Sequence, residues 1–440
     1  EGKHIMKSAL LQKIERREAV ISVIGLGYVG LPLAVEFGKE GYRVVGVDVS
    51  IEKVDLLNKG ISYIPDIPTE DVASLVEKGL LSATTDYSVL KQVDAISICV
   101  PTPLRKTKDP DMSYIIAAAD EIAQYSHPGL LIVLESTTYP GTTDELIVPR
   151  MIGNGYEVGK DVFVCFSPER IDPGNKTYGV RNTPKIIGGV TPHCVEVAQA
   201  LYSKAIDHVV SVSSTRAAEM VKLLENTFRS VNIGLVNEMA LMCDKLNVNV
   251  WEVIEAASTK PFGFMTFYPG PGLGGHCIPI DPLYLSWKLK ALNYNARFIE
   301  LASEINSNMP LYVVNRVMEA LNDERKTVNG SHILVLGAAY KRDIDDIRES
   351  PALDVIRLLQ ERGADVVYHD PYIADLRHEG LDVESVALTA DAVSRADCVV
   401  IVTDHTCFDY AWLGSHAHLI MDSRNAMKHI NAPQARVVLL

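Results

Sequence analysis

The amino-acid sequence predicts an α/β protein with two doubly wound parallel-sheet domains joined by a long central helix. Three segments of the 440-residue chain support this fold class. Residues 19–48 have the pattern of a strand, a glycine turn, a helix and a second strand. Residues 214–246 keep helical spacing for about nine turns, and residues 332–369 repeat the first pattern. Near-continuous apolar strands that alternate with helices are typical of parallel sheets covered on both faces.

Composition limits the classes of function. A chain of 440 residues exceeds what one hydrophobic core usually organises, and its apolar fraction of 47% favours globular domains. Because it has no run of about 18 apolar residues and no signal-peptide pattern, we expect no membrane partner and a cytoplasmic location. The net charge of -14 argues against binding to nucleic acid. Seven scattered cysteines without Cys-x-x-Cys pairs fit a reducing compartment, and we predict no metal site.

The first domain is expected over residues 19–212, after an N-terminal tail (1–18) to which we assign no function. Its further strands are expected at 94–100, 130–135 and 162–166. In "GLGYVG", Gly25, Gly27 and Gly30 have the spacing of a Rossmann dinucleotide turn that follows a strand and opens a helix. The first glycine permits the tight turn, the second lets backbone approach a pyrophosphate, and the third lets helix pack on strand.

An acidic residue at the end of the second strand predicts which dinucleotide binds. Asp48 suits the two ribose hydroxyls of NAD and would repel the 2′-phosphate of NADP. The alternative is a surface carboxylate in a turn. The loops "VPTP" (100–103) and "STTYPGTT" (136–143) follow later strands, where open parallel sheets place their ligands. The predicted NAD contacts in these turns also include Tyr28, Val29, Val100, Pro101, Thr102, Ser136 and Thr137.

The central helical domain is expected over residues 213–325. Its long helix, with Ser213 or Ser214 as a cap, is predicted to connect the domains and to form a dimer surface. Two shorter helices broken near Gly234 are the alternative.

The stretch "GPGLGGHCIPIDP" presents one thiol behind a glycine-rich turn. Such backbone is costly to order and usually marks close approach to a ligand, so Cys277 is the candidate nucleophile. Lys222 and Asn226 share one helix face, and Asp281 follows the thiol by four residues. A nearby ammonium would favour a thiolate. A solvated helix face is the alternative for the lysine and asparagine, and His276 is interpreted as a loop-shaping residue.

The C-terminal domain, residues 326–440, repeats the first. "ILVLGAAYKR" corresponds to "ISVIGLGYVG", and "LQERGADVVYHD" to "FGKEGYRVVGVD". The phosphate turn of this second Rossmann-like domain is interpreted as having lost its glycines.

Six motifs in order resemble the nucleotide-sugar 6-dehydrogenases over residues 20–430: "GLGYVGLPLA", "STTYPGTT", "SPERIDPGNK", "AAEMVKLLENTFRSVNIGLVNE", "YPGPGLGGHCIPIDP" and "GAAYKRDIDDIRESP". Two of these motifs, "SPERIDPG" and "PGPGLGGHCIPIDP", resemble the UDP-N-acetylglucosamine 6-dehydrogenase branch of the family. The product of that branch is used in surface polysaccharide synthesis. Pro173 and Ile280 depart from the UDP-glucose pattern. UDP-GalNAc, UDP-ManNAc and UDP-glucose are the alternative substrates.

The resemblance implies a four-electron oxidation of the sugar C6 by NAD, through a thiohemiacetal and a thioester on Cys277. It implies proton transfer by Lys222 and Asp281, orientation by Asn226, and placement of the hydrolytic water by Glu169 and Thr137. A surface loop is the alternative for Glu169. The resemblance adds Lys341 to the cofactor contacts, and a homodimer through the long helix. The substrate contacts that it implies are Glu169, Arg170, Lys222, Asn226, Tyr268, Gly270, Gly272, Gly274, Arg348 and Arg424.

Two other classes of protein share part of this pattern. A two-electron β-hydroxyacid-type dehydrogenase also joins a Rossmann domain to a long helix with lysine and asparagine. It needs neither a thiol nor a nucleotide-type third domain at the C-terminal end. A non-enzymatic NAD-dependent scaffold is the third possibility. The joint presence of Lys222, Asn226, Cys277 and Asp281 argues against it.

Overall fold

The computed structural model describes residues 5–105, 109–172, 175, 177–275 and 277–440. Pro173 and His276, both used in the sequence analysis, lie outside these residues. The chain divides into two compact units. The first unit comprises Glu1–Glu225 and Trp287–Asn293, and the second comprises Asn226–Ser286 and Tyr294–Leu440. These units cut across the domain boundaries expected from the sequence, which stay predictions.

The first unit contains a sheet in the order β3-β2-β1-β4-β5-β6-β7-β8. All neighbouring strands are parallel except the antiparallel pair β6 and β7. The predicted strands are confirmed, whereas β3, β7 and β8 were not predicted, because they are short, contain glycine or lie at an edge. The strands are β1 (Val20–Ile24), β2 (Arg43–Val47), β3 (Leu81–Thr84), β4 (Ala95–Ile98), β5 (Leu131–Leu134), β6 (Phe163–Phe166), β7 (Lys185–Gly189) and β8 (Val209–Val212).

Helices cover both faces of this sheet, which explains why its strands are apolar throughout. Ile21 and Val23 of β1 share one core with side chains from α1, α2, α4 and α7, while Ile24 shares another with α5 and α6. The N-terminal helix thus packs on the core through Leu10 and Ile14. The helical elements are α1 (Ile5–Glu15), α2 (Gly30–Lys39), α3 (Ile51–Asn58), α4 (Thr69–Glu77), η2 (Tyr87–Gln92), α5 (Ser113–Tyr125), η3 (Thr143–Ile147), α6 (Val148–Gly153) and α7 (Pro192–Ala205).

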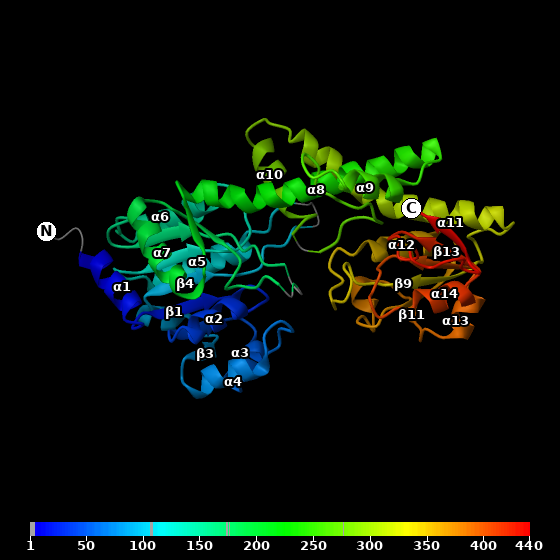
Figure 1. The fold of residues 1–440 in the computed structure, drawn as a ribbon. Coiled ribbons are helices and arrows are strands. Elements are labelled where there is room, and N and C mark those ends of the chain that lie inside the picture. Colours follow the sequence, from blue (N-terminus) through cyan, green and yellow to red (C-terminus); the bar gives the residue numbers. More distant parts are fainter. Residues whose placement is uncertain (1–4, 106–108, 173–174, 176, 276) are drawn as a thin grey trace. The chain divides into compact units, whose positions relative to one another are not determined.

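The long helix α8 runs without interruption over Thr215–Leu246 (Figure 1). The predicted continuous helix is therefore confirmed, and the alternative break near Gly234 is wrong. A Cβ on Gly234 would lie 3.2 Å from Ala302, so close packing accounts for this glycine. The hydroxyl of Ser214 accepts the Ala217 N–H at 3.1 Å, which identifies Ser214 as the cap. No helix among the described residues is long and apolar enough to span a membrane.

The second unit contains a wholly parallel sheet in the order β11-β10-β9-β12-β13-β14. This order repeats that of the first six strands of the first unit. Its strands are β9 (His332–Leu336), β10 (Asp365–His369), β11 (Glu384–Ser385), β12 (Cys398–Ile401), β13 (Leu419–Asp422) and β14 (Arg436–Leu439). The remaining helical elements are α9 (Val250–Ser258), α10 (Asp281–Lys290), α11 (Arg297–Asp323), α12 (Pro351–Glu361), η4 (Arg377–Glu379), α13 (Ala390–Arg395) and α14 (Tyr410–His416).

The two sheets also repeat one hydrogen-bonded turn. Asp48 accepts the Leu26 N–H at 2.7 Å, and Asp370 accepts the Ala338 N–H at the same distance. The expectation that the C-terminal turn has lost its glycines is wrong for the first position. Gly337 has φ +84°, as Gly25 has +90°, because both turns need a left-handed residue.

Candidate active site

The glycine turn between β1 and α2 has the geometry that a dinucleotide requires. A Cβ on Gly25 would lie 2.7 Å from the Cys99 carbonyl oxygen, and one on Gly30 would lie 1.8 Å from the Gly25 oxygen. Around Gly27, by contrast, no heavy atom lies within 4 Å of such a Cβ. The outer glycines are thus required by protein packing, whereas the middle one leaves open space beside the N-terminus of α2, which suits a pyrophosphate.

Asp48 follows β2 and is not a surface carboxylate, because it is only 8% exposed. Besides its bond to Leu26, it accepts the Ser50 N–H at 2.9 Å, and Lys53 lies 3.7 Å away. Each carboxylate oxygen keeps lone-pair capacity for a ribose hydroxyl. The residues present therefore fit NAD. The Asp48 carboxylate would repel the 2′-phosphate of NADP.

The other predicted cofactor residues differ in their surroundings. The Ser136 hydroxyl donates to the carbonyls of Ile98, at 3.2 Å, and Val100, at 2.8 Å, so it ties the turn after β5 to the end of β4. Four more of these side chains lie in the same region with graded exposure: Tyr28 and Pro101 are exposed, Val29 is half-buried and Thr102 is buried. Lys341, in the second unit, is half-buried.

Three predicted catalytic residues lie in the first unit. The Lys222 ammonium donates to the Thr137 hydroxyl at 2.5 Å, which joins α8 to the turn after β5. Glu169 is buried, and its Oε1 accepts the N–H groups of Arg170 and Ile171 at 2.7 and 2.8 Å. Burial alone would raise the pKa of Glu169, but Lys185, the Ile171 N–H and Lys222 together lower it. The surface-loop alternative for Glu169 is therefore wrong.

Two residues beside Glu169 were missed by the sequence analysis. The Lys185 ammonium donates to Glu135 at 2.6 Å and to Glu169 at 3.2 Å, and all three side chains are buried. The sequence does contain a signal for both residues, because each is a charged residue at the end of an apolar strand. Lys185 begins "KIIGG", and Glu135 ends "LLIVLE". Arg170, a predicted substrate contact, pairs with Glu225 at 2.7 Å.

Three other predicted catalytic residues lie in the second unit. Cys277 is half-buried, and its carbonyl accepts the Asp281 N–H at 2.8 Å at the start of α10. The Asn226 amide donates to the buried Asp281 carboxylate at 2.6 Å. The bidentate partner Asp346 raises the pKa of Arg348, burial opposes this, and a thiolate on Cys277 would add to the rise. A cation therefore lies near the predicted nucleophile.

The glycine-rich loop before Cys277 packs tightly against the C-terminal part of the chain. A Cβ on Gly270 would lie 2.7 Å from the Arg424 guanidinium, and one on Gly274 would lie 2.5 Å from the Tyr340 Cβ. Gly272 has φ +139°, and a Cβ built on it would lie 3.2 Å from the Pro351 Cβ. Protein packing thus accounts for these predicted substrate contacts as glycines. Tyr268 is exposed and stacks on Trp251 with a centroid separation of 6.1 Å.

Other features of the described residues do not compete with this site. Cys99, Cys165, Cys194, Cys243 and Cys398 are buried, and burial raises the pKa of Cys398 to about 12. No group of three His, Cys, Asp or Glu side chains within the described ranges could hold a metal ion.

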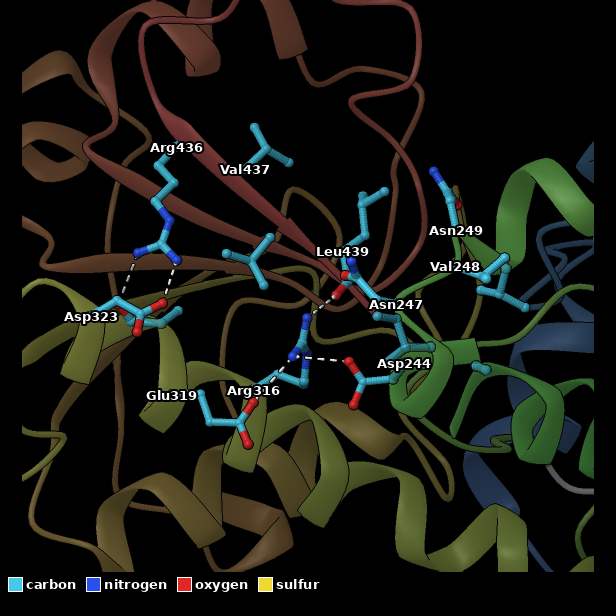
Figure 2. Close-up of a pocket in the computed structure, with 15 residues that line it drawn as sticks. Asp244, Asn247, Val248, Asn249, Arg316, Glu319, Asp323, Arg436, Val437 and Leu439 are labelled. Carbon is cyan, nitrogen blue, oxygen red and sulfur yellow. Dashed lines mark hydrogen bonds and ion pairs between the residues drawn. The ribbon is translucent and has the colours of Figure 1, made fainter. Parts of the chain in front are cut away.

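A pocket of about 730 Å³ in the second unit contains none of the predicted site residues. Figure 2 shows that its charged side chains pair with one another: Arg316 with Asp244 at 3.2 Å, and Arg436 with Asp323 at 2.6 Å. The lining has three acidic side chains (Asp244, Glu319 and Asp323) against two arginines, so its excess of negative charge would not select an anionic nucleotide sugar.

Comparison with known proteins covers nearly the whole chain. The NAD-binding, central and UDP-binding domains of the UDP-glucose/GDP-mannose dehydrogenase family match residues 19–206, 216–308 and 334–429. A UDP-N-acetyl-D-mannosamine dehydrogenase of Methanococcus maripaludis is 36% identical, covering 93% of each chain. An NDP-N-acetyl-D-galactosaminuronic acid dehydrogenase of Ralstonia nicotianae is 39% identical, covering 88% of this chain and 91% of the relative.

The fold agrees with these sequence matches. The structure of the UDP-D-ManNAc dehydrogenase of Pyrococcus horikoshii superposes with a TM-score of 0.86 at 35% identity, covering 95% of this chain and 99% of the other. The cofactor is NAD, as the glycine turn and Asp48 predicted. The chain belongs to the UDP-glucose/GDP-mannose dehydrogenase family of nucleotide-sugar oxidoreductases.

Proposed function

We propose that this protein oxidises C6 of a UDP-N-acetylhexosamine to the uronate by a four-electron reaction, in the synthesis of surface polysaccharide precursors. The sequence motifs favour UDP-N-acetylglucosamine, whereas the named relatives are dehydrogenases of N-acetylmannosamine and N-acetylgalactosaminuronic acid compounds. UDP-N-acetyl-D-mannosamine is therefore the first candidate and UDP-N-acetylglucosamine the second. The observation that carries the proposal is the half-buried Cys277 at the end of a glycine-rich loop that is hydrogen-bonded to Arg348, in a chain of this family.

The roles of the side chains follow from their chemistry. NAD, when bound, supplies the hydride acceptor for each oxidation. Cys277 adds through sulfur to the C6 aldehyde, which retains this reactive carbonyl as a thiohemiacetal. Lys222 and Asn226, one turn apart on α8, stabilise negative charge on the C6 oxygen. Asp281, anchored by Asn226, assists proton transfer.

The last step releases the product. Water adds to the thioester carbonyl and gives one proton to Glu169, and the C–S bond breaks to leave the uronic acid and the Cys277 thiolate. The uronic acid then loses its proton to solvent and becomes the uronate. Thr137, which accepts from Lys222, helps to place the water.

A panel assay tests the proposal. UDP-N-acetyl-D-mannosamine, UDP-N-acetylglucosamine, UDP-N-acetylgalactosamine and UDP-glucose are each incubated with enzyme and NAD, and both NADH and uronate are measured. Two NADH per uronate are expected. One NADH without a carboxylate would indicate the two-electron β-hydroxyacid-type reaction instead, and a clear preference for UDP-glucose would contradict the N-acetylhexosamine assignment.

We also propose a homodimer through α8. Leu224 and Leu235 of this helix are 65% and 53% exposed, and Met220 and Phe228 are 37% and 43% exposed. Neighbouring apolar side chains on one exposed helix favour contact with a second copy.

A further inference from the structure

A chain of buried polar side chains crosses the sheet of the first unit, and we call it the Lys185 cluster. Its members are Ser97, Glu135, Glu169, Lys185 and Tyr202. They come from β4, the end of β5, the loop after β6, β7 and α7. Lys185 is 5% exposed, Glu135 1% and Tyr202 fully buried. Such a set of ionisable groups inside an apolar sheet requires a physical reason.

Stability alone does not supply that reason. Removing two carboxylates and one ammonium from water costs several kcal/mol for each ion, and their attraction often does no more than offset this cost. The cluster does, however, fix geometry. The Tyr202 hydroxyl donates to Glu135, and Ser97 lies 2.8 Å from that hydroxyl. Glu135 is therefore held on one side, and it holds Lys185 at 2.6 Å on the other.

Glu169 is the last member of this series of hydrogen bonds. Its Oε1 is occupied by two backbone N–H groups, while its Oε2 accepts from Lys185 at 3.2 Å. We propose that Lys185 is a positioning residue that holds the Glu169 carboxylate in one orientation and as the anion, ready to accept the proton of the hydrolytic water. This inference rests on the proposed role of Glu169 in releasing the uronate.

The charges around Glu169 support this role. Lys185 of β7 and Lys222 of α8 are the cations that lower the pKa of Glu169. Glu135 and Cys99 are the titratable groups whose negative charge would oppose that of Glu169. Burial raises the pKa of Glu135, even though the Lys185 ammonium lies 2.6 Å away and opposes the rise. The pKa of Glu169 is lowered instead, because backbone donors add to the effect of Lys185. Without the lysine charge, burial would favour the protonated acid.

Replacing the lysine tests the inference. Lys185→Met removes the charge at similar volume, Lys185→Arg keeps it, and Lys160→Met is a matched control on a partly exposed lysine paired with Glu157. After the acyl-enzyme forms in a single turnover, its hydrolysis is followed by quench and intact-mass measurement from about pH 5 to about pH 9. Lys185→Met is expected to raise the midpoint of the acidic limb by about one to three pH units. Lys185→Arg and Lys160→Met should keep the wild-type midpoint.

Each outcome decides between the two claims. An unchanged midpoint in folded Lys185→Met, while Glu169→Gln slows hydrolysis, overturns the inference and leaves the proposed function standing. Normal hydrolysis in Glu169→Gln overturns the role of Glu169 and the inference with it. If Lys185→Met does not fold, the double variant Glu135→Gln, Lys185→Met also removes the second carboxylate that Lys185 neutralises, so that Glu169 alone loses its lysine. The same midpoint shift is expected. A wild-type midpoint in the double variant also overturns the inference.

Discussion

At the residue scale, Cys277 differs from the other cysteines in its surroundings. Five of the seven are buried, where desolvation disfavours a thiolate, whereas Cys277 is half-buried near Arg348. We predict that Cys277→Ser lowers uronate formation by several orders of magnitude and leaves NAD affinity unchanged, because the dinucleotide turn and Asp48 keep their structure. Product analysis by chromatography and calorimetric NAD titration measure these effects. Cys407→Ser, at an exposed thiol, is the control, and unchanged turnover in Cys277→Ser would exclude the thiol from the mechanism.

Glu219 predicts a pH dependence of stability. On α8 it accepts the Gly141 and Thr143 N–H groups at 2.5 and 2.9 Å and the Thr143 hydroxyl at 2.8 Å. Burial raises its pKa from 4.5 to about 7, although these donors oppose the rise. Because the folded pKa exceeds the unfolded one, its stabilising contribution is complete below pH 4.5 and is lost as pH rises through about 7. The loss amounts to at most about 3 kcal/mol.

Calorimetry tests this prediction. The Tm of the wild type should fall between about pH 5 and about pH 8 by more than that of Glu219→Gln, whose side chain does not titrate. Glu157→Gln, which changes an exposed carboxylate, is the control and should follow the wild type. Parallel Tm curves for Glu219→Gln and the wild type would show that Glu219 does not carry the effect.

The residues of the site could be predicted where one local segment determines the geometry. The outer glycines of the first turn, Asp48 and the partly exposed thiol all follow from motifs of a few residues. Contacts between distant segments could not be predicted. Lys222 and Thr137 are 85 positions apart, and Lys185 and Glu135 are 50 apart. Periodicity places each of these residues on an element, but it does not say which elements meet.

At the element scale, the glycine-rich loop is predicted to be intolerant of a methyl group. Gly274→Ala would bring a Cβ to 2.5 Å from the Tyr340 Cβ and 3.0 Å from the Glu349 oxygen. We expect a cost of about 1–3 kcal/mol and a lower kcat, because the loop leads directly to Cys277. Thermal unfolding and steady-state assays measure both. Gly153→Ala, where no heavy atom lies within 4 Å, is the control, and equal behaviour of the two variants would contradict the packing argument.

Elements with strong periodicity were predicted better than short ones. The long apolar stripe of α8 predicted a continuous helix, and the near-continuous apolar strands predicted the centre of each sheet. β3 and β8 are four residues long with exposed positions, and β7 ends in two glycines. Their pairing with the sheet, rather than their own composition, determines their structure.

At the scale of the whole molecule, the exposed apolar side chains of α8 predict association. Leu224→Lys together with Leu235→Lys should convert a dimer into monomers, because both leucines are more than half exposed on the described chain. Light scattering measures the mass. Leu292→Lys, at a 68% exposed leucine outside α8, is the control. A wild-type protein that is monomeric would contradict the predicted dimer.

The cytoplasmic location stays a prediction from the sequence.

The repeated turn has a consequence for how acidic residues after a second strand are interpreted. Asp48 and Asp370 bind backbone N–H groups of their own turns in the same way, yet Asp370 is also closed off by His405 at 2.9 Å. A carboxylate at this position therefore stabilises its own turn in both domains. It can bind a nucleotide only where the neighbouring side chains leave it accessible. Its diagnostic value in a newly determined sequence therefore depends on the residue that occupies the place of His405.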